Sequence, residues 1–484
     1  MGTISPALRP SRVRLGVLAF ACTLSLITYL DRVCISRVQE DIQRDLDVSD
    51  KAMGLVFGAF ALGYALFEVP GGWLGDRWGS RRVLMRIVIW WSLFTALTGC
   101  VWRFTFDSGR TLSFGSLEIP LLLNGLVVLV LVRFMFGAGE AGAYPNLARV
   151  VKTWFPYRER AMAQGGIWMS ARLGGAVAPL VIGRLTAALG WRQAFWVLGT
   201  IGAVWAVAFF FWFRDRPEEK PECNDAEREL IRSGQHDPPA AGMVVHQEGT
   251  TVSDPASTGI EPPPPAHAAD GHSWPPMRLM LTSVTMWATC VAAFFVSFGW
   301  YFYPTWQPKY LKEVFGISFE NSEILTGLPF LCGAIGSLIG GGISDRLVRR
   351  IGRRWGRSLV GIVGFTGAGV CVLATGFVTQ AWQAVALLCL AFLINDLAIP
   401  VIWAVSADIG GRFVGTVAGL MNTIGAFGAL LSPALIPHVL AGLPDAMPVE
   451  QRWQIIFAGL AVAWFISAAA WLFIDASKPL FGRR

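Results

Sequence analysis

The chain has 484 residues, of which 54% are hydrophobic and only 15% are charged. A water-soluble protein would carry about a quarter charged residues, so this composition excludes an ordinary soluble enzyme and favours a membrane protein. The formal net charge is +7, but Lys and Arg gather in a few short loops, so the charge does not indicate nucleic-acid binding.

Apolar runs of about 20 residues, long enough to cross a bilayer as a helix, recur along the whole chain. They lie at roughly 13–36, 50–72, 83–101, 118–144, 161–183, 191–213, 279–303, 323–343, 357–378, 381–405, 413–437 and 453–474. The predicted fold class is therefore an all-α membrane protein with twelve transmembrane helices.

The first apolar run contains the adjacent charges Asp31 and Arg32 where a signal peptide would carry a small-residue cleavage site, so we interpret it as a retained helix. Basic clusters at 9–14, 77–82, 152–160, 346–357 and 483–484 alternate with neutral or acidic loops. This is the positive-inside pattern, and it predicts that both termini are cytoplasmic. Residues 102–117 are predicted to form an external loop with a small hairpin around Asp107–Gly109.

A short motif occurs twice, each time between two apolar runs. Residues 71–82 read GGWLGDRWGSRR, and residues 341–354 read GGISDRLVRRIGRR. A second correspondence is Gly174-x-x-x-x-Pro179 with Gly428-x-x-x-x-Pro433. Both repeats predict two similar halves, which would form two pseudo-symmetric six-helix bundles.

The predicted halves, 1–213 and 279–484, are joined by a polar segment at 214–278 that contains a run of four prolines. Low hydrophobicity and many prolines are typical of a linker, which we expect in the cytoplasm with one short amphipathic helix near 224–233.

These features resemble the major facilitator superfamily, and several motifs are similar to those of its anion:cation symporter family. The motifs are Tyr29-Leu30-Asp31-Arg32, RFMFGAGEAGAYPN at 133–146, TWFPYRERA at 153–161 and WQPKYL at 306–311. The resemblance implies a carrier in the plasma membrane that takes up an organic anion, such as a sugar acid, together with protons. It also implies that the first and fourth helices of each half line a central cavity.

Six ionisable residues lie within predicted helices: Asp31, Arg32, Arg133, Glu140, Arg172 and Asp396. An ionised group at the bilayer centre costs about 2.5–3.5 kcal/mol, so it indicates function. A guanidinium binds a carboxylate through two parallel hydrogen bonds, and Arg32 is therefore the predicted substrate anchor, with Arg133 and Arg172 as further cations. The resemblance implies that Asp31 and Glu140 take up protons, and we assign Asp396 to the same proton-coupling group.

The alternative is an ion-pair network that only holds helices together, in which Arg172 would pair with Glu140 or Asp31. Arg133 and Glu140 are seven residues apart, about 10 Å along one helix face, so we expect no direct bridge between them.

Aromatic and amide side chains of the same region are predicted to contact the substrate: Tyr29, Trp168, Tyr301, Tyr303, Trp403 and Asn422. Aromatic faces and hydrogen-bond donors suit the carbons and hydroxyls of a sugar acid.

The repeated loop motif is interpreted as a cytoplasmic gate in which glycine permits close helix packing and charged groups pair across the halves. Its predicted residues are Gly72, Asp76, Arg77, Arg81, Arg82, Asp345 and Arg346. Glu68 is expected to belong to the same network.

The predicted function is proton-coupled symport of an organic anion by alternating access. The sequence lacks a GxxxxGK[ST] phosphate loop, which argues against a primary pump. An aromatic-acid carrier, an inorganic-anion carrier for phosphate or nitrate, and a non-transporting nutrient sensor are the alternatives. We expect no enzymatic activity, cofactor, metal or nucleic-acid partner, and a monomer in the lipid bilayer.

Overall fold

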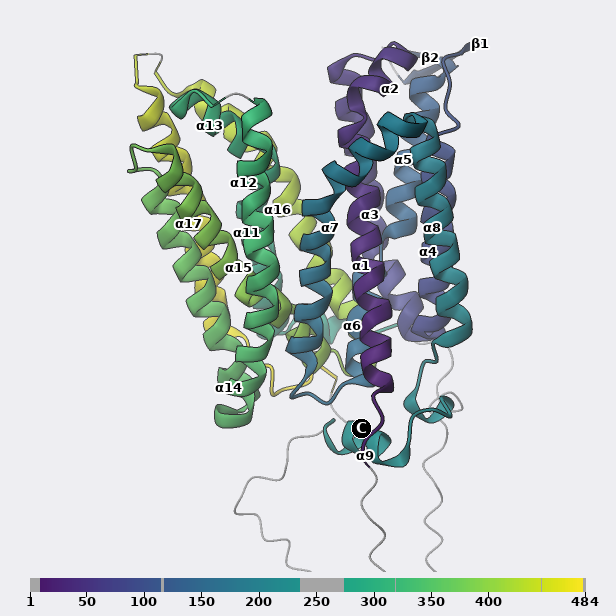
Figure 1. The fold of residues 1–484 in the computed structure, drawn as a ribbon, viewed down its shortest axis with the longest axis vertical. Helices are drawn as coiled ribbons and strands as arrows, with labels where there is room; N and C mark the ends of the chain where they lie inside the picture. The colour runs from purple at the N-terminus through teal and green to yellow at the C-terminus, as the bar shows by residue number, and fades with distance from the viewer. Residues whose placement is uncertain (1–8, 115–116, 236–273, 318, 445, 482–484) are drawn as a thin grey trace, which may run out of the picture.

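The computed structural model describes residues 9–114, 117–235, 274–317, 319–444 and 446–481. Figure 1 shows a helical molecule in which α1–α8 gather on one side and α11–α17 on the other. The helices of the first half are α1 (Val13–Arg37), α2 (Gln39–Leu46), α3 (Asp50–Trp78), α4 (Ser80–Thr98), α5 (Gly125–Glu140), α6 (Ala143–Trp154), α7 (Arg160–Leu189) and α8 (Trp191–Trp212). Those of the second half are α11 (Val284–Trp300), α12 (Phe302–Thr305), α13 (Gln307–Phe315), α14 (Phe319–Thr375), α15 (Ala381–Ile409), α16 (Val414–Gly442) and α17 (Val449–Ala470).

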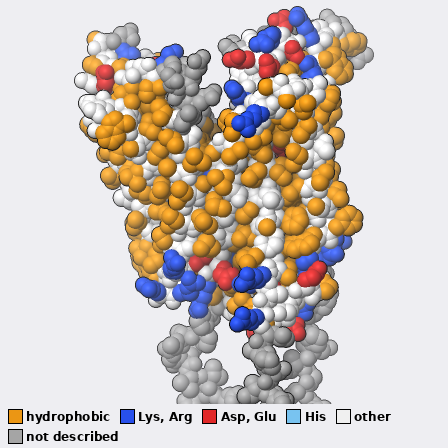
Figure 2. Space-filling view, viewed as in Figure 1, with side chains coloured by type: hydrophobic (Ala, Val, Ile, Leu, Met, Phe, Trp, Pro, Cys, Tyr) orange, Lys and Arg blue, Asp and Glu red, His pale blue; other side chains and the backbone are white. Residues whose placement is uncertain are grey.

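Ten helical segments in the described residues are long and apolar enough to cross a membrane. Figure 2 shows hydrophobic side chains over the middle of the visible face, with charged side chains concentrated toward both ends. Large apolar side chains such as Leu55, Val204 and Phe211 are more than half exposed, which suits contact with lipid rather than water.

Two of the twelve expected segments are not separate members of these ten. The segments 323–343 and 357–378 both fall in α14, which is interrupted at Gly352 by a positive φ of 81°. The segment 83–101 corresponds to α4, which carries three arginines in its first seven residues and is not among the ten.

The expected helix at 118–144 was wrong at its start. Residues 117–124 form strand β2 (Leu117–Asn124), which pairs antiparallel with β1 (Thr105–Phe114). Pro120 lacks the N–H that a helix interior requires, and Asn124 instead caps α5 by accepting a hydrogen bond from the Val127 N–H. The hairpin turn was expected around 107–109, but β1 continues through these residues to Phe114, and only a register irregularity lies near Asp107.

The two Gly-x-x-x-x-Pro motifs occupy corresponding places in the halves. A Cβ at Gly174 in α7 would lie 2.8 Å from the Leu26 carbonyl oxygen of α1. A Cβ at Gly428 in α16 would lie 2.1 Å from the Phe294 carbonyl oxygen of α11. In each half, glycine therefore lets this helix pack directly against the backbone of the first helix.

Within the linker, the structure contains a short 3₁₀ turn at Pro217–Glu219 and helices α9 (Asp225–Ser233) and α10 (Met277–Leu281). Helix α9 matches the expected helix near 224–233, and Figure 1 shows it below α1. Its Glu227 accepts hydrogen bonds from the Ser11 hydroxyl at 2.6 Å and the Val13 N–H at 3.1 Å, so a linker carboxylate satisfies the first turn of α1.

Candidate functional site

An arginine–glutamate pair joins α1 to the end of α5. The Arg32 Nε donates to Glu140 Oε1 at 2.6 Å. Glu140 is the last residue of α5, because Ala141 leaves the helical region and Gly142 has a φ of 83°. The Arg32 side chain is 22% exposed although it lies within a membrane-length helix, whereas the Glu140 side chain is buried. Arg32 is therefore partly accessible within the helical part of the molecule.

Several polar atoms around this pair are unsatisfied. Among the described residues, neither carboxyl oxygen of buried Asp31 has a hydrogen-bond partner, and the same holds for Arg32 Nη2 and Glu140 Oε2. More than nine in ten buried polar groups in proteins are hydrogen-bonded, so such a cluster indicates a site completed by a proton, water or ligand.

Arg133 is 2% exposed, and its guanidinium faces the rings of Phe136 at 4.8 Å and Phe195 at 5.9 Å. No ion pair between Arg133 and Glu140 exists in the described part of the chain, as the spacing predicts. Its charge nevertheless interacts electrostatically with the carboxylates of Asp31 and Glu140, so Arg133 belongs to the same buried charge cluster.

Aromatic rings surround the Arg32 guanidinium. Its Cζ lies 4.6 Å from the ring centroid of Tyr64, 5.6 Å from that of Phe60 and 5.7 Å from that of Tyr29. Tyr64 and Phe60 belong to α3 and were not predicted. Asn422 of α16 reaches the same place, since its amide donates to the Tyr64 hydroxyl at 3.0 Å and to Glu68 Oε1 at 2.7 Å.

A second ion pair connects the two halves. Arg172 of α7 donates from Nε to Asp396 Oδ2 at 2.5 Å and from Nη2 to Asp396 Oδ1 at 3.1 Å. The alternative expectation that Arg172 pairs with Glu140 or Asp31 is wrong, because its partner comes from α15.

The other predicted aromatic residues separate into two groups. Trp168 stacks on Tyr144 with ring centroids 4.9 Å apart, and Trp403 lies 5.6 Å from Trp168. Tyr303 is buried, with its hydroxyl donating to the Leu388 carbonyl at 3.3 Å and its ring against Phe392, whose ring also covers the Arg172 guanidinium.

Tyr301 ends α11 and is partly buried, with its ring 5.2 Å from that of Trp300. Trp300 in turn lies over the Arg172 guanidinium. Tyr301 is thus separated from Arg172 by the Trp300 ring, while its hydroxyl interacts electrostatically with Arg32, Tyr29 and Glu140 of the first site.

Asp76 of the first repeated motif lies at the N-terminus of α16. It accepts hydrogen bonds from the N–H groups of Gly415 at 2.9 Å and Thr416 at 2.7 Å, the second and third residues of that helix. A carboxylate there satisfies free N–H groups and favours the helix dipole. A Cβ at Gly72 would lie 2.0 Å from the Gly415 carbonyl oxygen, so only glycine permits this approach of α3 to α16.

Asp345 of the second motif makes the equivalent contacts from the second half to the first. It accepts from the N–H groups of Ala161 at 3.3 Å and Met162 at 2.7 Å, the second and third residues of α7. A Cβ at Gly341 would lie 2.3 Å from the Ala161 carbonyl oxygen. Each motif therefore caps a helix of the opposite half.

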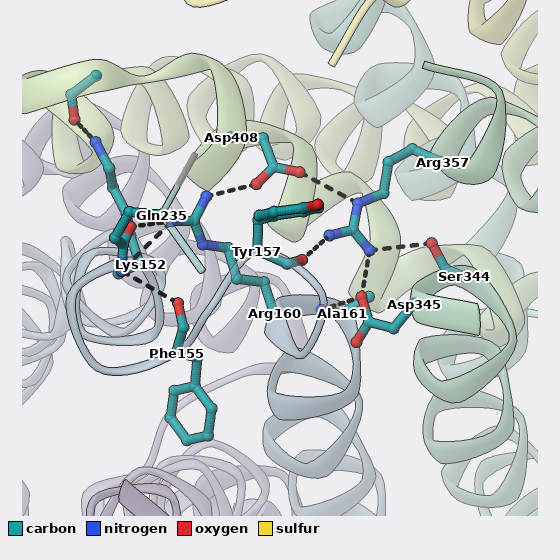
Figure 3. Close-up of polar contacts among 11 residues, drawn as sticks. Lys152, Phe155, Tyr157, Arg160, Ala161, Gln235, Ser344, Asp345, Arg357 and Asp408 are labelled. Atoms are coloured by element: carbon teal, nitrogen blue, oxygen red, sulfur yellow. Dashed lines mark hydrogen bonds and ion pairs between the residues drawn. The ribbon is translucent and has the colours of Figure 1, made fainter. Parts of the chain in front are cut away.

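Buried charges extend the Asp345 contact into a network that spans both halves (Figure 3). Asp408 at the end of α15 accepts from Arg160 at 2.6 Å and from Arg357 at 3.2 Å. Arg357 also donates to Asp345 at 2.7 Å and to the Tyr157 carbonyl at 2.8 Å.

Two further contacts bring the linker and the loop before α16 into this network. Lys152 donates to the Gly411 carbonyl, and Arg160 donates to Gln235, which follows α9. The sequence singled out Lys152, Arg160 and Arg357 only as basic loop residues. Asp408, an isolated charge at the end of an apolar run, was the available signal.

The basic residues of the motif behave differently from its aspartates. Arg77, Arg82 and Arg346 are exposed, and among the described residues none of them forms an ion pair across the halves. Arg81 bonds within its own half, donating to the Phe210 carbonyl at 2.8 Å. The helical period turns these side chains outward while Asp76 and Asp345 face the opposite half.

The halves are joined at the end that carries α9 and separate toward the other end. Figure 2 shows a notch between the two lobes at the end opposite the linker. The Figure 3 network and the Asp76 contacts lie on the joined side. Arg32 lies within α1 and Arg172 within α7, so both residues are inside helices rather than at the closed end.

Comparison with known proteins gives one consistent family. A model described as Major Facilitator Superfamily matches residues 21–433. The protein named "Probable sulfoacetate transporter SauU" from Cupriavidus necator is 31% identical over 430 residues, which cover 89% of this chain and 88% of that protein. The "Hexuronate transporter" of Bacillus subtilis is 27% identical and covers 98% and 97% of the two chains.

Another relative is the "Probable galactarate/D-glucarate transporter GudP" of Escherichia coli, which is 29% identical over 89% of this chain and 88% of that protein. Among solved structures, the proton:xylose symporter XylE bound to 6-bromo-6-deoxy-D-glucose aligns with a TM-score of 0.64 at 14% identity, covering 96% and 95% of the chains. At that identity the likeness supports the fold alone.

Proposed function

Because the chain belongs to the major facilitator superfamily, we propose that it is a secondary active transporter that moves a small organic anion across the membrane by alternating access. The observation that carries the proposal is the Arg32 site. A partly accessible guanidinium, held by Glu140 and framed by Tyr29 and Tyr64, keeps one nitrogen free for a ligand.

The names of the relatives support an organic anion rather than an inorganic one. They denote sulfoacetate, hexuronate and galactarate or glucarate transporters, whose cargoes all carry at least one carboxylate. Tyr29 and Asn422 are suited to the carbon and hydroxyl part of such a molecule.

The finer architecture is part of the proposal. Dividing α14 at Gly352 and adding α4 raises the ten candidate spans to twelve, arranged as two pseudo-symmetric six-helix bundles. The domains are then 1–213, 214–278 and 279–484, with both termini in the cytoplasm and the chain in the plasma membrane. The closed end would be cytoplasmic, and the binding site would face outward.

Proton coupling follows from the charge balance at the site. A substrate that takes Arg32 from Glu140 leaves a buried carboxylate without a partner, which costs several kcal/mol unless a proton neutralises it. Asp31, with two unsatisfied oxygens, is the adjacent proton acceptor. Substrate and proton thus favour each other's binding, as symport requires.

Uptake by proteoliposomes tests the proposal. The purified protein should accumulate labelled galactarate, hexuronate or sulfoacetate when the exterior is acidic, and accumulation should fall when the pH gradient is removed. Arg32→Ala should weaken binding at least about a hundredfold, since two charge-assisted hydrogen bonds are lost. Arg44→Ala is the control, because Arg44 makes an exposed pair with Asp41 in α2.

Two results would contradict separate parts of the proposal. Unchanged affinity in Arg32→Ala would remove the anchor. Uptake that ignores the pH gradient would remove proton coupling. Glu140→Gln should retain exchange of labelled for unlabelled substrate but lose gradient-driven accumulation.

A further inference from the structure

The Arg172–Asp396 pair is a buried ion pair across the interface between the halves. The side chains are 3% and 0% exposed, and the contact is a two-pronged guanidinium–carboxylate bond between α7 and α15. A transporter whose halves move against each other must alter this contact in each cycle. Separating a buried ion pair costs free energy, so a purely structural role would oppose that movement.

Asp396 is held in place independently of Arg172. It also accepts from the Ser337 hydroxyl of α14 at 3.3 Å and from the Asn395 amide at 2.9 Å. Asn395 is itself fixed by the Trp464 indole of α17 at 2.9 Å. The second half therefore retains a positioned carboxyl group if the guanidinium leaves.

Arg172 is connected to the first binding group through one residue. Its Nη1 lies 3.5 Å from the Tyr29 hydroxyl, and the Tyr29 ring lies under Arg32 at 5.7 Å. Trp300 at 5.0 Å and Trp168 at 5.5 Å cover the Arg172 guanidinium. Two guanidinium groups thus flank a single tyrosine, each paired with one carboxylate.

We propose that Arg172 is a second anion anchor and that the substrate is a small organic dianion with an acid group at each end. One acid group replaces Glu140 on Arg32, and the other replaces Asp396 on Arg172. This inference rests on the proposed function and specifies its substrate class.

The charge balance fixes the proton count. Glu140 and Asp396 each lose a cation and each take up one proton, so two protons accompany one dianion and no net charge moves. Several charged or titratable groups face this exchange. Near the Arg32–Glu140 pair they are Asp31, Tyr64, Glu68, Arg133 and Tyr144. Near the Arg172–Asp396 pair they are Tyr29, Tyr144 and Tyr303.

The test compares probes that differ by one acid group. Galactarate is compared with galactonate, and sulfoacetate with acetate, by calorimetric binding to the purified protein. The wild-type protein should bind at least one dianion about 10–100-fold more tightly than its matched monoanion, because one charged hydrogen-bonded contact is added.

The paired variant Arg172→Gln with Asp396→Asn keeps the net charge unchanged. It should lower dianion affinity by the same factor, bring the ratio close to one and leave monoanion affinity within about twofold. If this variant does not fold, Arg172→Lys, which keeps the charge but loses the fork, should reduce the ratio partially.

Separate outcomes distinguish the two proposals. A dianion preference that persists in these variants, or a wild-type protein that binds the monoanion equally well, overturns the second anchor while transport stands. Wild-type protein that binds none of the four probes overturns both. Dianion uptake that responds to an imposed membrane potential overturns the two-proton balance.

Discussion

The closeness of α3 to α16 makes Gly72 a sensitive point for the conformational equilibrium. In Gly72→Ala the new Cβ would lie 2.0 Å from the Gly415 carbonyl oxygen, whereas ordinary contact begins near 3.4 Å. The helices must therefore part by more than an ångström. That movement lengthens the bonds from Asp76 to the N–H groups of Gly415 and Thr416, which are now 2.9 and 2.7 Å.

The expected magnitude follows from those two bonds. Each hydrogen bond to a charged group contributes about 1.5–3 kcal/mol, so a loss of about 3 kcal/mol should change the ratio of closed to open protein roughly a hundredfold. Gly415→Ala, whose Cβ would lie 2.3 Å from the Gly72 carbonyl oxygen, should act in the same direction.

Spin labels at the exposed positions Arg82 and Arg350, in a background without the eight free cysteines, would report the distance between the halves at this end. Gly58→Ala is the matched control, because it adds the same methyl group to α3 where nothing lies within 4 Å. A Gly72→Ala distance distribution that coincides with that of Gly58→Ala would refute the reasoning.

Two further predictions concern the closed end. Asp408→Asn removes the carboxylate shared by buried Arg160 and Arg357, and it should lower the free energy of unfolding by about 3–5 kcal/mol. The control Asp41→Asn, in an exposed pair, should change the free energy of unfolding by less than about 1 kcal/mol. Equal thermal melting of the two variants would contradict this. Burial raises the pKa of Glu227, but the hydrogen bonds from Ser11 and Arg14 together lower it by more than burial raises it. The pKa of Glu227 therefore lies below the usual value of about 4.3. Its stabilising effect is present above that value and is lost as the pH falls through the folded-state pKa, so the melting difference between wild type and Glu227→Gln should be constant from pH 8 to pH 5 and shrink below about pH 4. A difference that grows on acidification would show that the carboxylate is not the stabilising form.

Apolar length was sufficient to predict most membrane helices. The run 13–36 became Val13–Arg37, because composition and length alone decide whether a segment can satisfy its backbone in a bilayer. The run 118–144 failed because it joined a strand to a helix of similar hydropathy. Pro120 and Asn124 indicate that the helix begins only after Asn124, and these two residues are a stronger signal than the hydropathy of the whole segment.

The charged centre was predictable in part. Arg32 and Glu140 were identified because ionised groups are rare in apolar helices, and the structure brings them together. The pairing of Arg172 with Asp396 depends on how two halves pack, which no local pattern encodes. Asp76 accepts hydrogen bonds from two backbone N–H groups and the Thr416 hydroxyl and forms an ion pair with Arg149, and backbone N–H groups have no signature in the sequence.

The capping contacts also have a consequence for biosynthesis. Helix α1 leaves the ribosome first, yet Glu227, which satisfies its first turn, is made 213 or more residues later. The start of α7 waits 183 residues for Asp345, and Asp76 waits 339 residues for Gly415. The starts of α1 and α7 are therefore made before the carboxylates that cap them, whereas the start of α16 meets a carboxylate already present in α3. A chain truncated before α16 would lack the contacts of α3 with that helix and could not close this end of the molecule.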